Sequence, residues 1–325
     1  MTDSRISFAS ENMRWKKKLI LGIKVLVTMG LVLWLIERVD WAVVGEKIAN
    51  VSWPLILLYI VLQLCGNAIS AKKWQIIASF KGLSFSVDEG FFTYMTGAFI
   101  NNFLPSTIGG DAYRSLWLAK RSEAKAAAVS TVVFDRFTGL WMMAFFALVF
   151  SIFLVPFYRK SFPLVVTLIS LTVFFVVDVI ITYMYCRPWF HRFIERLPFY
   201  RVRRILEEVI FYTKKHIWLR TSFWAGLFVV VGIGLTNFVL FHALGSDIGI
   251  LRFLSVIFLV TIISNIPISI NNIGIKEWAY VTFFALVGVS PETAITVALL
   301  SRFLQMFISF IALPQYWRTR EQERS

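Results

Sequence analysis

Long runs of apolar residues, separated by short polar stretches, dominate the chain. A run of about 20 apolar residues is long enough to cross a bilayer as a helix. Six runs are predicted to be full membrane spans: 19–37, 53–71, 126–155, 163–185, 221–244 and 291–313. The pattern therefore predicts an all-α polytopic membrane protein.

Two further apolar regions, 88–119 and 250–289, are interrupted near their centres by residues that disfavour a continuous helix. The interrupting residues are Asn101, Asn102, Pro105, Gly109 and Gly110 in the first region, and Asn265, Pro267, Asn271, Asn272 and Gly274 in the second. Non-helical backbone is tolerated at membrane depth only where protein or water satisfies its polar groups. We expect the prolines and glycines to break the helices and the asparagines to satisfy the freed backbone groups. Each region is predicted to be a re-entrant helix pair that enters and leaves on one side.

Composition and charge support this topology. The chain is 58% hydrophobic and 16% charged, whereas soluble domains are about 45–50% apolar. Basic residues favour cytoplasmic loops, and the loop 186–220 holds nine basic and three acidic residues. With both broken regions re-entrant, this loop and both termini lie in the cytoplasm. Two full crossings would place the loop outside, so we reject that alternative.

The chain is interpreted as one transmembrane domain over 1–325, with repeat 1 at about 53–155 and repeat 2 at about 219–315. The apolar run that begins at Leu19 follows three lysines and is predicted to be an uncleaved signal anchor. The cytoplasmic linker, about 186–220, contains an amphipathic helix at 198–218. That helix binds anionic headgroups or is a plain connector. A shorter interfacial helix is predicted around Trp41 on the outer side.

The two broken regions are related by an internal repeat. One constant shift of the numbering, called the repeat shift below, places Glu277 on Asp111 and Arg302 on Arg136 without a gap. It also places Phe303 on Phe137, Ala294 on Ala128 and Gly232 on Gly66. Because the first broken region opens from the inside and the second from the outside, the repeats are predicted to be inverted. Inverted repeats with broken helices are typical of transporters whose substrate site lies between the repeats.

Each repeat carries an acid followed by an arginine at the same separation along the chain, and a charge at membrane depth needs a partner. We predict the ion pairs Asp111–Arg136 and Glu277–Arg302. Two interpretations stay open: the pairs only staple the fold, or they line a polar cavity in which the arginine attracts a phosphate. Arg114 is a phosphate ligand by residue type or a snorkelling residue at the inner interface. A half-helix N-terminus after Gly110 would add N–H donors toward an anion.

Several classes of chemistry find no support in the sequence. No nucleophile, zinc-protease, P-loop or dinucleotide motif is present. The histidines lack metal-site spacing, and the two cysteines imply neither a disulfide framework nor a metal site. We therefore predict no catalytic residues, no metal and no cofactor. The net charge of +14 is attributed to loops facing anionic lipid, not to nucleic acid.

Two segments carry a family resemblance: LPSTIGGDAYRSLWLAKR with AAAVSTVVFDRFTGL, and INNIGIKEWAYVTFFALVGVSPETAITVALLSRFL. They resemble the lysylphosphatidylglycerol synthase transmembrane family, also called flippase-like, over roughly 15–315. The matching positions are Pro105, Gly109, Gly110, Asp111, Arg114, Arg136, Gly274, Glu277, Gly288, Val289 and Arg302. Asn272 and Ile273 depart from the Gly pair that the family often has there.

The resemblance implies lipid translocation without the soluble synthase domain of the multi-domain relatives. We predict a lipid flippase or transporter of the bacterial cytoplasmic (inner) membrane that moves a phospholipid or lipid-linked headgroup. The expected partner is a membrane lipid: an anionic phospholipid, an aminoacylated lipid or a polyprenyl-linked glycolipid. A homodimer is an open alternative. The predicted substrate-binding residues are Asn102, Pro105, Gly109, Gly110, Asp111, Arg114, Arg136, Asn271, Gly274, Glu277 and Arg302.

Two rival functions stay open. One is a membrane-embedded transferase acting on a lipid-linked donor, with Asp111 or Glu277 as general base. The other is a non-catalytic membrane partner of a lipid-modifying system that recruits proteins through the loop 186–220.

Overall fold

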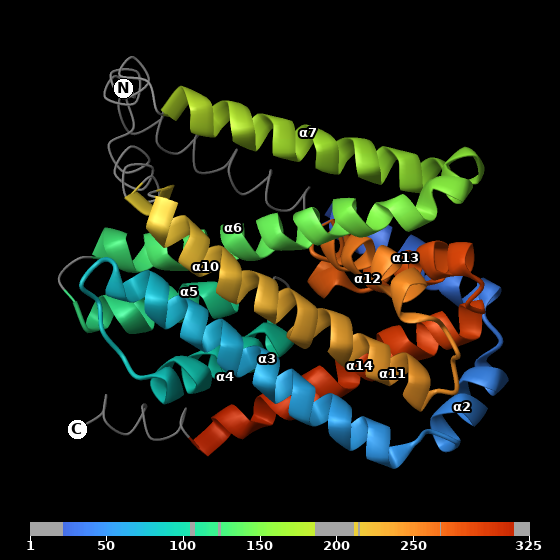
Figure 1. Cartoon of the computed structure of the whole chain (residues 1–325). Coiled ribbons are helices and arrows are strands. Elements are labelled where there is room, and N and C mark those ends of the chain that lie inside the picture. Colours follow the sequence, from blue (N-terminus) through green and yellow to red (C-terminus); the bar gives the residue numbers. More distant parts are fainter. Residues whose placement is uncertain are drawn as a thin grey trace, which may run out of the picture.

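The computed structural model describes residues 22–104, 108–122, 125–185, 211–213, 215–266 and 268–314. Every element within these ranges is a helix. The axes of the long helices share roughly one orientation, left to right in Figure 1, and neighbouring helices need not have the same chain direction. Pro105, Pro267 and most of the predicted amphipathic helix 198–218 lie outside the described residues, as does the start of the predicted anchor.

Within the described ranges, four helices are long and apolar enough to cross a membrane, and they confirm four of the six predicted spans. They cover Trp53–Ser79, Lys125–Pro156, His216–Ala243 and Pro291–Ala312. The other two predicted spans also fall on helices, at 22–38 and in α7 (Phe162–Tyr185). The short helix α2 (Trp41–Ala49) forms where an interfacial helix is predicted, with Asp40 accepting hydrogen bonds from its first backbone N–H groups.

The first broken region forms two antiparallel helices, α4 (Val87–Phe103) and α5 (Ile108–Lys120). Ser86 and Glu89 form a reciprocal cap at the start of α4. Arg121, just after α5, reaches back to Glu89 with an N–O distance of 2.7 Å. The two outer ends of the hairpin therefore lie together, and its tip lies between Phe103 and Ile108.

The prediction that Gly109 and Gly110 break the first region is wrong, because both lie in the first turn of α5. Both glycines lie instead where a side chain would collide with a neighbouring residue. A side chain at Gly110 would overlap the carbonyl oxygen of Gly97, and one at Gly109 would overlap Leu104. The small residues therefore let α4 and α5 approach each other closely.

The second broken region forms α12 (Ile250–Ser264), the 3-10 turn η4 (Ile270–Asn272) and α13 (Ile275–Phe284). Here the predicted glycine does mark the break: Gly274 has φ +84° and precedes the first residue of α13. Asn271 and Asn272 also have positive φ, a conformation that asparagine tolerates better than most residues. This explains why the turn forms without a glycine pair at 272–273.

Helix α3 (Trp53–Ser79) packs against α10 (Lys215–Phe228), the π-helical turn η3 (Val229–Leu235) and α11 (Thr236–Ala243). The two partners are antiparallel, because the backbone N–H of Ser52 donates to the carbonyl of Ala243 at the opposite chain end. They cross most closely at Gly66 and Gly232, where a Cβ on Gly66 would stand 2.6 Å from the Cα of Gly232. No side chain fits at this crossing.

Replacing Gly66 by alanine is expected to destabilise the fold, because the added methyl group would push the two antiparallel helices apart. Overpacking of this kind costs about 1–3 kcal/mol. The midpoint of SDS-induced unfolding in mixed micelles should fall. Gly30→Ala is the matched control, because nothing lies within 4 Å of its added Cβ. Equal midpoints for the two variants would contradict the close crossing.

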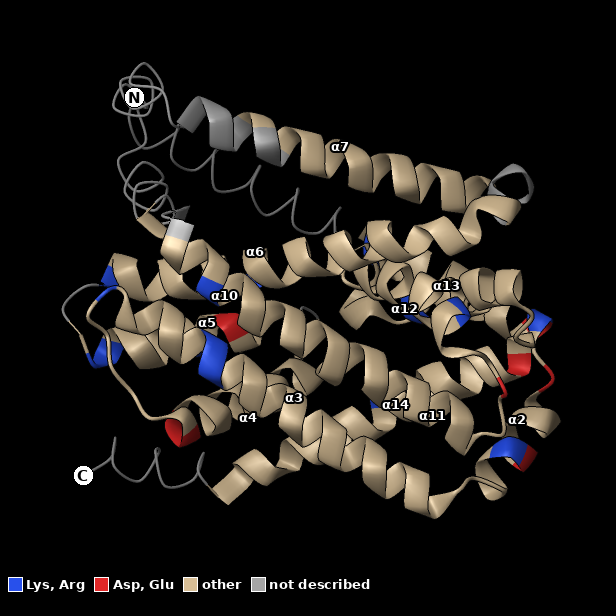
Figure 2. Cartoon of the chain, viewed as in Figure 1, with Lys and Arg blue, Asp and Glu red and all other residues tan. Residues whose placement is uncertain are grey.

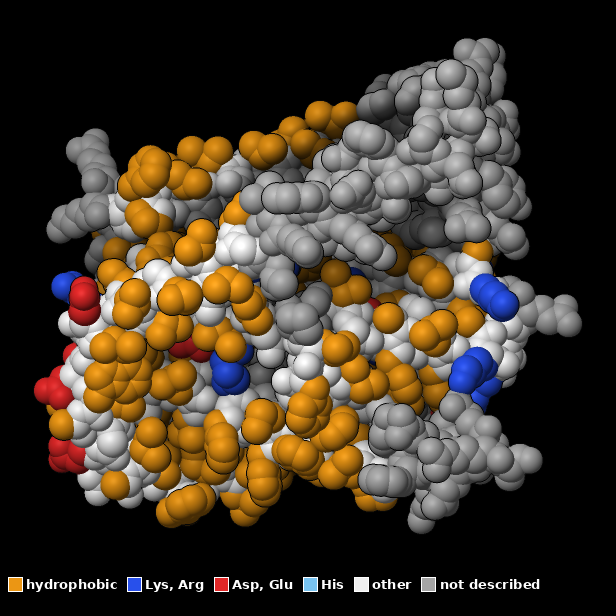
Figure 3. Space-filling model, turned by 180° about the vertical axis from the view of Figure 1, so that it is seen from behind, with side chains coloured by type: hydrophobic (Ala, Val, Ile, Leu, Met, Phe, Trp, Pro, Cys, Tyr) orange, Lys and Arg blue, Asp and Glu red, His pale blue; other side chains and the backbone are white. Residues whose placement is uncertain are grey.

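The surface is that of a membrane protein. Apolar side chains cover most of the face shown in Figure 3, and most of the charged side chains gather toward its two edges. The hairpin α4–α5 occupies one half of the long dimension and α12–α13 the other (Figure 1). The two hairpin tips consequently approach each other near the middle of the molecule.

Candidate functional site

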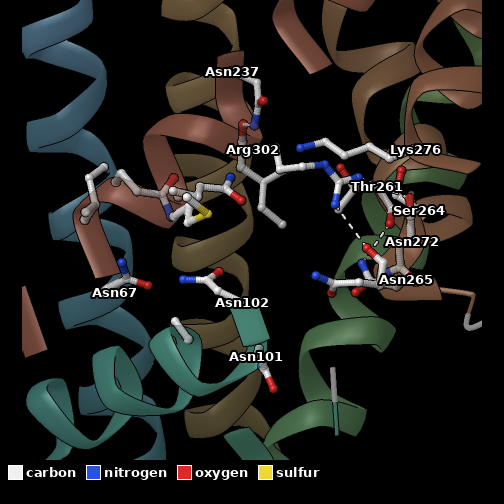
Figure 4. A pocket seen from close by; sticks show the side chains of 18 of the residues that line it. Asn67, Asn101, Asn102, Asn237, Thr261, Ser264, Asn265, Asn272, Lys276 and Arg302 are labelled. Carbon is white, nitrogen blue, oxygen red and sulfur yellow. Dashed lines mark hydrogen bonds between the residues drawn. The ribbon is translucent and has the colours of Figure 1, made fainter. Parts of the chain in front are cut away.

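One cavity of about 630 Å³ lies at the meeting of the two hairpins. Residues of α3, α4, α6 (Lys125–Phe150), η3, α11, α12, α13 and α14 (Pro291–Ser309) line it. Its size is typical of sites that hold a small molecule or a headgroup. The cavity therefore collects side chains from both halves of the chain, as Figure 4 shows.

Amides dominate the polar part of the lining. The contributing side chains are Gln63, Asn67, Asn101, Asn102, Asn237, Asn265, Asn271, Asn272 and Gln305. The prediction that asparagines satisfy freed backbone groups is confirmed for Asn101, because its side-chain oxygen accepts the Gly110 N–H at 2.7 Å. The Gly110 N–H is consequently not available to an anion. Asn102 instead donates to the Ser309 hydroxyl at 2.8 Å.

The predicted pair Asp111–Arg136 is present and bidentate. The Arg136 Nε and one terminal nitrogen donate to the two carboxylate oxygens at 2.8 and 3.1 Å. Arg136 lines the cavity, and its side chain is 48% exposed. Asp111 lies behind it and is not part of the lining. The pair therefore ties α5 to α6 while presenting a guanidinium to the cavity.

The predicted pair Glu277–Arg302 is also present, with additional backbone contacts. Arg302 donates to the buried Glu277 carboxylate at 2.9 Å, and to the carbonyls of Asn271 and Asn272 at 3.0 and 3.1 Å. Glu277 also accepts the Gly274 N–H at 2.7 Å. Arg302 thus holds the left-handed turn of the second hairpin to α14, and it also lines the cavity.

Replacing Arg302 by alanine is expected to loosen the second hairpin. The substitution leaves a buried carboxylate and two carbonyls without their donor. Because Arg302 is 30% exposed, we expect a loss of about 2–3 kcal/mol, at the low end of the range for buried pairs. Unfolding midpoints measure the loss, with Arg121→Ala of the exposed Glu89 pair as the control. Equal losses of stability in Arg302→Ala and Arg121→Ala would contradict the role of Arg302 in holding the second hairpin to α14.

Arg114 has neither of the roles considered for it. It is buried, and it donates to Asp135 at 2.8 Å while its guanidinium lies over the rings of Tyr94 and Trp74. The Tyr94 hydroxyl donates to the same carboxylate. Arg114 is therefore a structural cation that neither lines the cavity nor snorkels to the interface.

Lys73 completes this buried cluster and corrects the predicted end of the second span. The sequence predicts that this span ends at residue 71, yet α3 continues to Ser79 and includes Lys73. The Lys73 ammonium lies 3.0 Å from an Asp135 carboxylate oxygen and donates to the Asp135 carbonyl at 2.8 Å. Figure 2 shows charged positions along the long helices as well as at their ends, and Lys73, Arg114 and Asp135 are all buried.

The cavity brings together four of the predicted site residues: Asn102, Asn271, Arg136 and Arg302. Gly109, Gly110, Asp111, Arg114, Gly274 and Glu277 stand outside the lining, and Pro105 lies outside the described residues. One cation was not selected from the sequence. Lys276 lines the cavity and is adjacent in the chain to Glu277, whose carboxylate binds Arg302.

Comparisons with known proteins give the family but not the ligand. The sequence model of the lysylphosphatidylglycerol synthase TM region matches residues 21–312. A UPF0104 membrane protein of Methanocaldococcus jannaschii is 23% identical over 288 residues, covering 82% of this chain and 84% of the relative. One of Methanothermobacter thermautotrophicus is 23% identical over 282 residues, covering 78% and 81%. No solved structure matches the chain. The chain belongs to the family of the lysylphosphatidylglycerol synthase TM region.

Proposed function

We propose that this protein moves a phospholipid or lipid-linked headgroup between the leaflets of the bacterial cytoplasmic membrane. The observation that carries the proposal is the polar, cation-lined cavity at the meeting of two helical hairpins. A headgroup crossing the apolar interior needs such a path, because transfer of polar groups into hydrocarbon is costly. The family, whose name refers to a lipid synthase, supports a lipid-related role.

We propose further that the cavity lies between two inverted repeats. The repeat shift carries α3 onto α10–η3–α11 and the start of α6, Lys125, onto the start of α14, Pro291. The counterparts α3 and α10–α11 are antiparallel, as inversion requires. Gly66 contacts Gly232, its own equivalent, so a pseudo-two-fold axis would pass between them.

Several residues that line the cavity are related to each other by the same repeat shift. Four equivalent pairs contribute to the lining from both repeats: Asn67 with Ile233, Met95 with Thr261, Ala98 with Ser264, and Arg136 with Arg302. A site on the repeat axis is the arrangement expected of a transporter that opens alternately to its two sides.

Each hairpin would be re-entrant, with its tip near the middle of the membrane. The tips expose large apolar side chains beside the polar cavity: Phe103, Leu104 and Ile108 on the first, and Ile266, Ile268 and Ile273 on the second. We infer that acyl chains stay against these surfaces, in lipid, while the headgroup crosses the cavity. The cytoplasmic placement of both termini belongs to the same proposal.

Reconstitution tests the proposal. Purified protein in liposomes with a fluorescent phosphatidylglycerol should make the inner-leaflet probe accessible to external dithionite. Empty liposomes should protect about half of the signal, because about half of the lipid faces inward. Protection that is unchanged by the protein would contradict translocation of this lipid class.

The rival transferase needs a carboxylate that is free to accept a proton. Asp111 and Glu277 are each held by an arginine, and Glu277 is 2% exposed, so neither resembles a general base poised for chemistry. Mass spectrometry of the same liposomes provides the test, because a transferase changes lipid mass and a transporter does not. The recruitment alternative predicts that deleting residues 186–210 matters more than any cavity substitution.

A further inference from the structure

The charged side chains that line the cavity are all cations among the described residues. Arg136, Lys276 and Arg302 line it, and no Asp or Glu does. The carboxylates lie behind the wall, where each is engaged by an arginine. A ligand in the cavity therefore meets positive charge.

The carboxylates behind the wall do not balance these cations. In the first repeat, Asp111 and Asp135 hold three cations: Lys73, Arg114 and Arg136. In the second, Glu277 holds Arg302, and Lys276 stands beside them. Five cations face three carboxylates in these linked clusters, which leaves an excess of two positive charges in a poorly solvated place. Uncompensated charge there is costly, so a counter-charge is expected.

Of these five cations, Lys276 is the one for which the structure shows no ion pair with a described carboxylate. Its ammonium donates to the Ser301 hydroxyl at 2.8 Å and lies 5.8 Å from the centre of the Tyr280 ring. The repeat explains the imbalance. Ser301 is the equivalent of Asp135, which neutralises cations in the first repeat, so the second repeat has a neutral hydroxyl where the first has a carboxylate. Figure 4 shows Lys276 beside Arg302 at the cavity.

We infer that the cavity selects headgroups of net negative charge, with the lipid phosphate as the counter-ion of Lys276, Arg136 and Arg302. A phosphodiester headgroup that has no amine carries one negative charge and therefore reduces the excess. An aminoacylated headgroup brings its own ammonium groups and meets like charge, so this cavity disfavours it. This inference rests on the proposed function, and it separates this chain from the lipid in the family's name.

Selectivity is measured with acyl-labelled fluorescent lipids in the dithionite assay. The probes are phosphatidylglycerol, zwitterionic phosphatidylcholine and lysylphosphatidylglycerol, each at trace amount in otherwise identical liposomes. The wild-type protein should move phosphatidylglycerol fastest and lysylphosphatidylglycerol slowest, with a ratio of about tenfold or more. A lysylphosphatidylglycerol rate equal to or above that of phosphatidylglycerol overturns the inference and leaves the proposed function intact. If none of the three probes moves, both the inference on selectivity and the proposed function are overturned.

Two variants assign the selectivity to Lys276. Lys276→Gln should slow phosphatidylglycerol and reduce its advantage over lysylphosphatidylglycerol to about twofold or less. Lys276→Arg should keep the advantage, which controls for folding, because it retains the charge. A ratio that is unchanged in Lys276→Gln removes the lysine from the selection and overturns its assignment.

A last experiment tests whether the cavity binds the phosphate of a lipid headgroup or free inorganic phosphate. Radiolabelled inorganic phosphate trapped inside the same liposomes should be retained by wild-type protein. Its release would reassign the cation cluster to a soluble anion and overturn selection of a lipid headgroup.

Discussion

Asp135→Ala is expected to remove most of the folded protein. The carboxylate lies between Lys73 and Arg114, and all three side chains are 4% exposed or less. Its loss leaves two cations buried side by side, and the nearest remaining carboxylate, Asp111, lies 3.5 Å from Arg114 and is already paired with Arg136. Removing one member of a buried ion cluster costs about 3–5 kcal/mol, a large part of the stability of a typical domain. SDS-unfolding midpoints and the yield of monodisperse protein in detergent measure the loss.

The control for Asp135→Ala is Glu89→Gln, which removes the charge of an exposed pair and keeps an acceptor for the cap at the start of α4. Glu89 and Arg121 are 37% and 45% exposed, and such pairs contribute about 0–1 kcal/mol. The control should therefore leave yield and unfolding midpoint near those of wild type. An Asp135→Ala protein as stable as the Glu89→Gln protein would contradict the account of the buried cluster.

Arg136→Gln is expected to abolish most lipid movement while the protein stays folded. The side chain is half-exposed into the cavity, and its partner Asp111 keeps Arg114 at 3.5 Å, so no buried charge is stranded. A cation that meets the phosphate along its path contributes about 1.5–3 kcal/mol, so the rate should fall at least about tenfold. Dithionite accessibility gives the rate, and the unfolding midpoint verifies the fold.

Arg252→Gln is the control for Arg136→Gln, because it removes one positive charge from an exposed residue outside the cavity. It should translocate lipid at the wild-type rate. A fully active Arg136→Gln protein would mean that the Asp111–Arg136 pair only staples α5 to α6, the alternative that the sequence left open.

The two acid-to-arginine pairs were predictable because spacing and repetition carried the information. The same acid-to-arginine separation occurs after both broken regions, which predicts the same local contact twice, and both pairs form. The four long apolar spans were predictable because membrane thickness sets helix length. The second break followed from Gly274, whose positive φ fits its residue type.

The buried cluster of Lys73, Arg114 and Asp135 was not predictable from local pattern. A lysine at the end of an apolar run ordinarily marks the membrane interface, and only the tertiary contact with Asp135 keeps Lys73 inside. Asp135 and Arg136 are neighbours in α6 and point to different partners, since successive helical residues diverge by about 100°. The signal that could have found the cluster was the position of Asp135 within an apolar span.

The prediction of a helix break at Gly109 and Gly110 was wrong for a related reason. Glycine breaks helices, but it also permits close helix packing, and sequence alone does not separate the two uses. The cavity amides Asn67 and Asn237 were missed because each lies in a predicted full span, with no charge or helix break beside it to indicate a site. Their convergence depends on how α3 crosses α10–η3–α11.

The most direct test of a headgroup path is to plug the cavity without changing a charge. Ala98 lines it, and a cysteine there can be labelled with a bulky neutral thiol reagent after reconstitution. The background is Cys65→Ser with Cys186→Ser, and the control is a cysteine at Leu57, which is 64% exposed and outside the lining. We predict that labelling Ala98→Cys stops fluorescent phosphatidylglycerol movement and that labelling Leu57→Cys does not. Undiminished movement through labelled Ala98→Cys protein would contradict a path through this cavity.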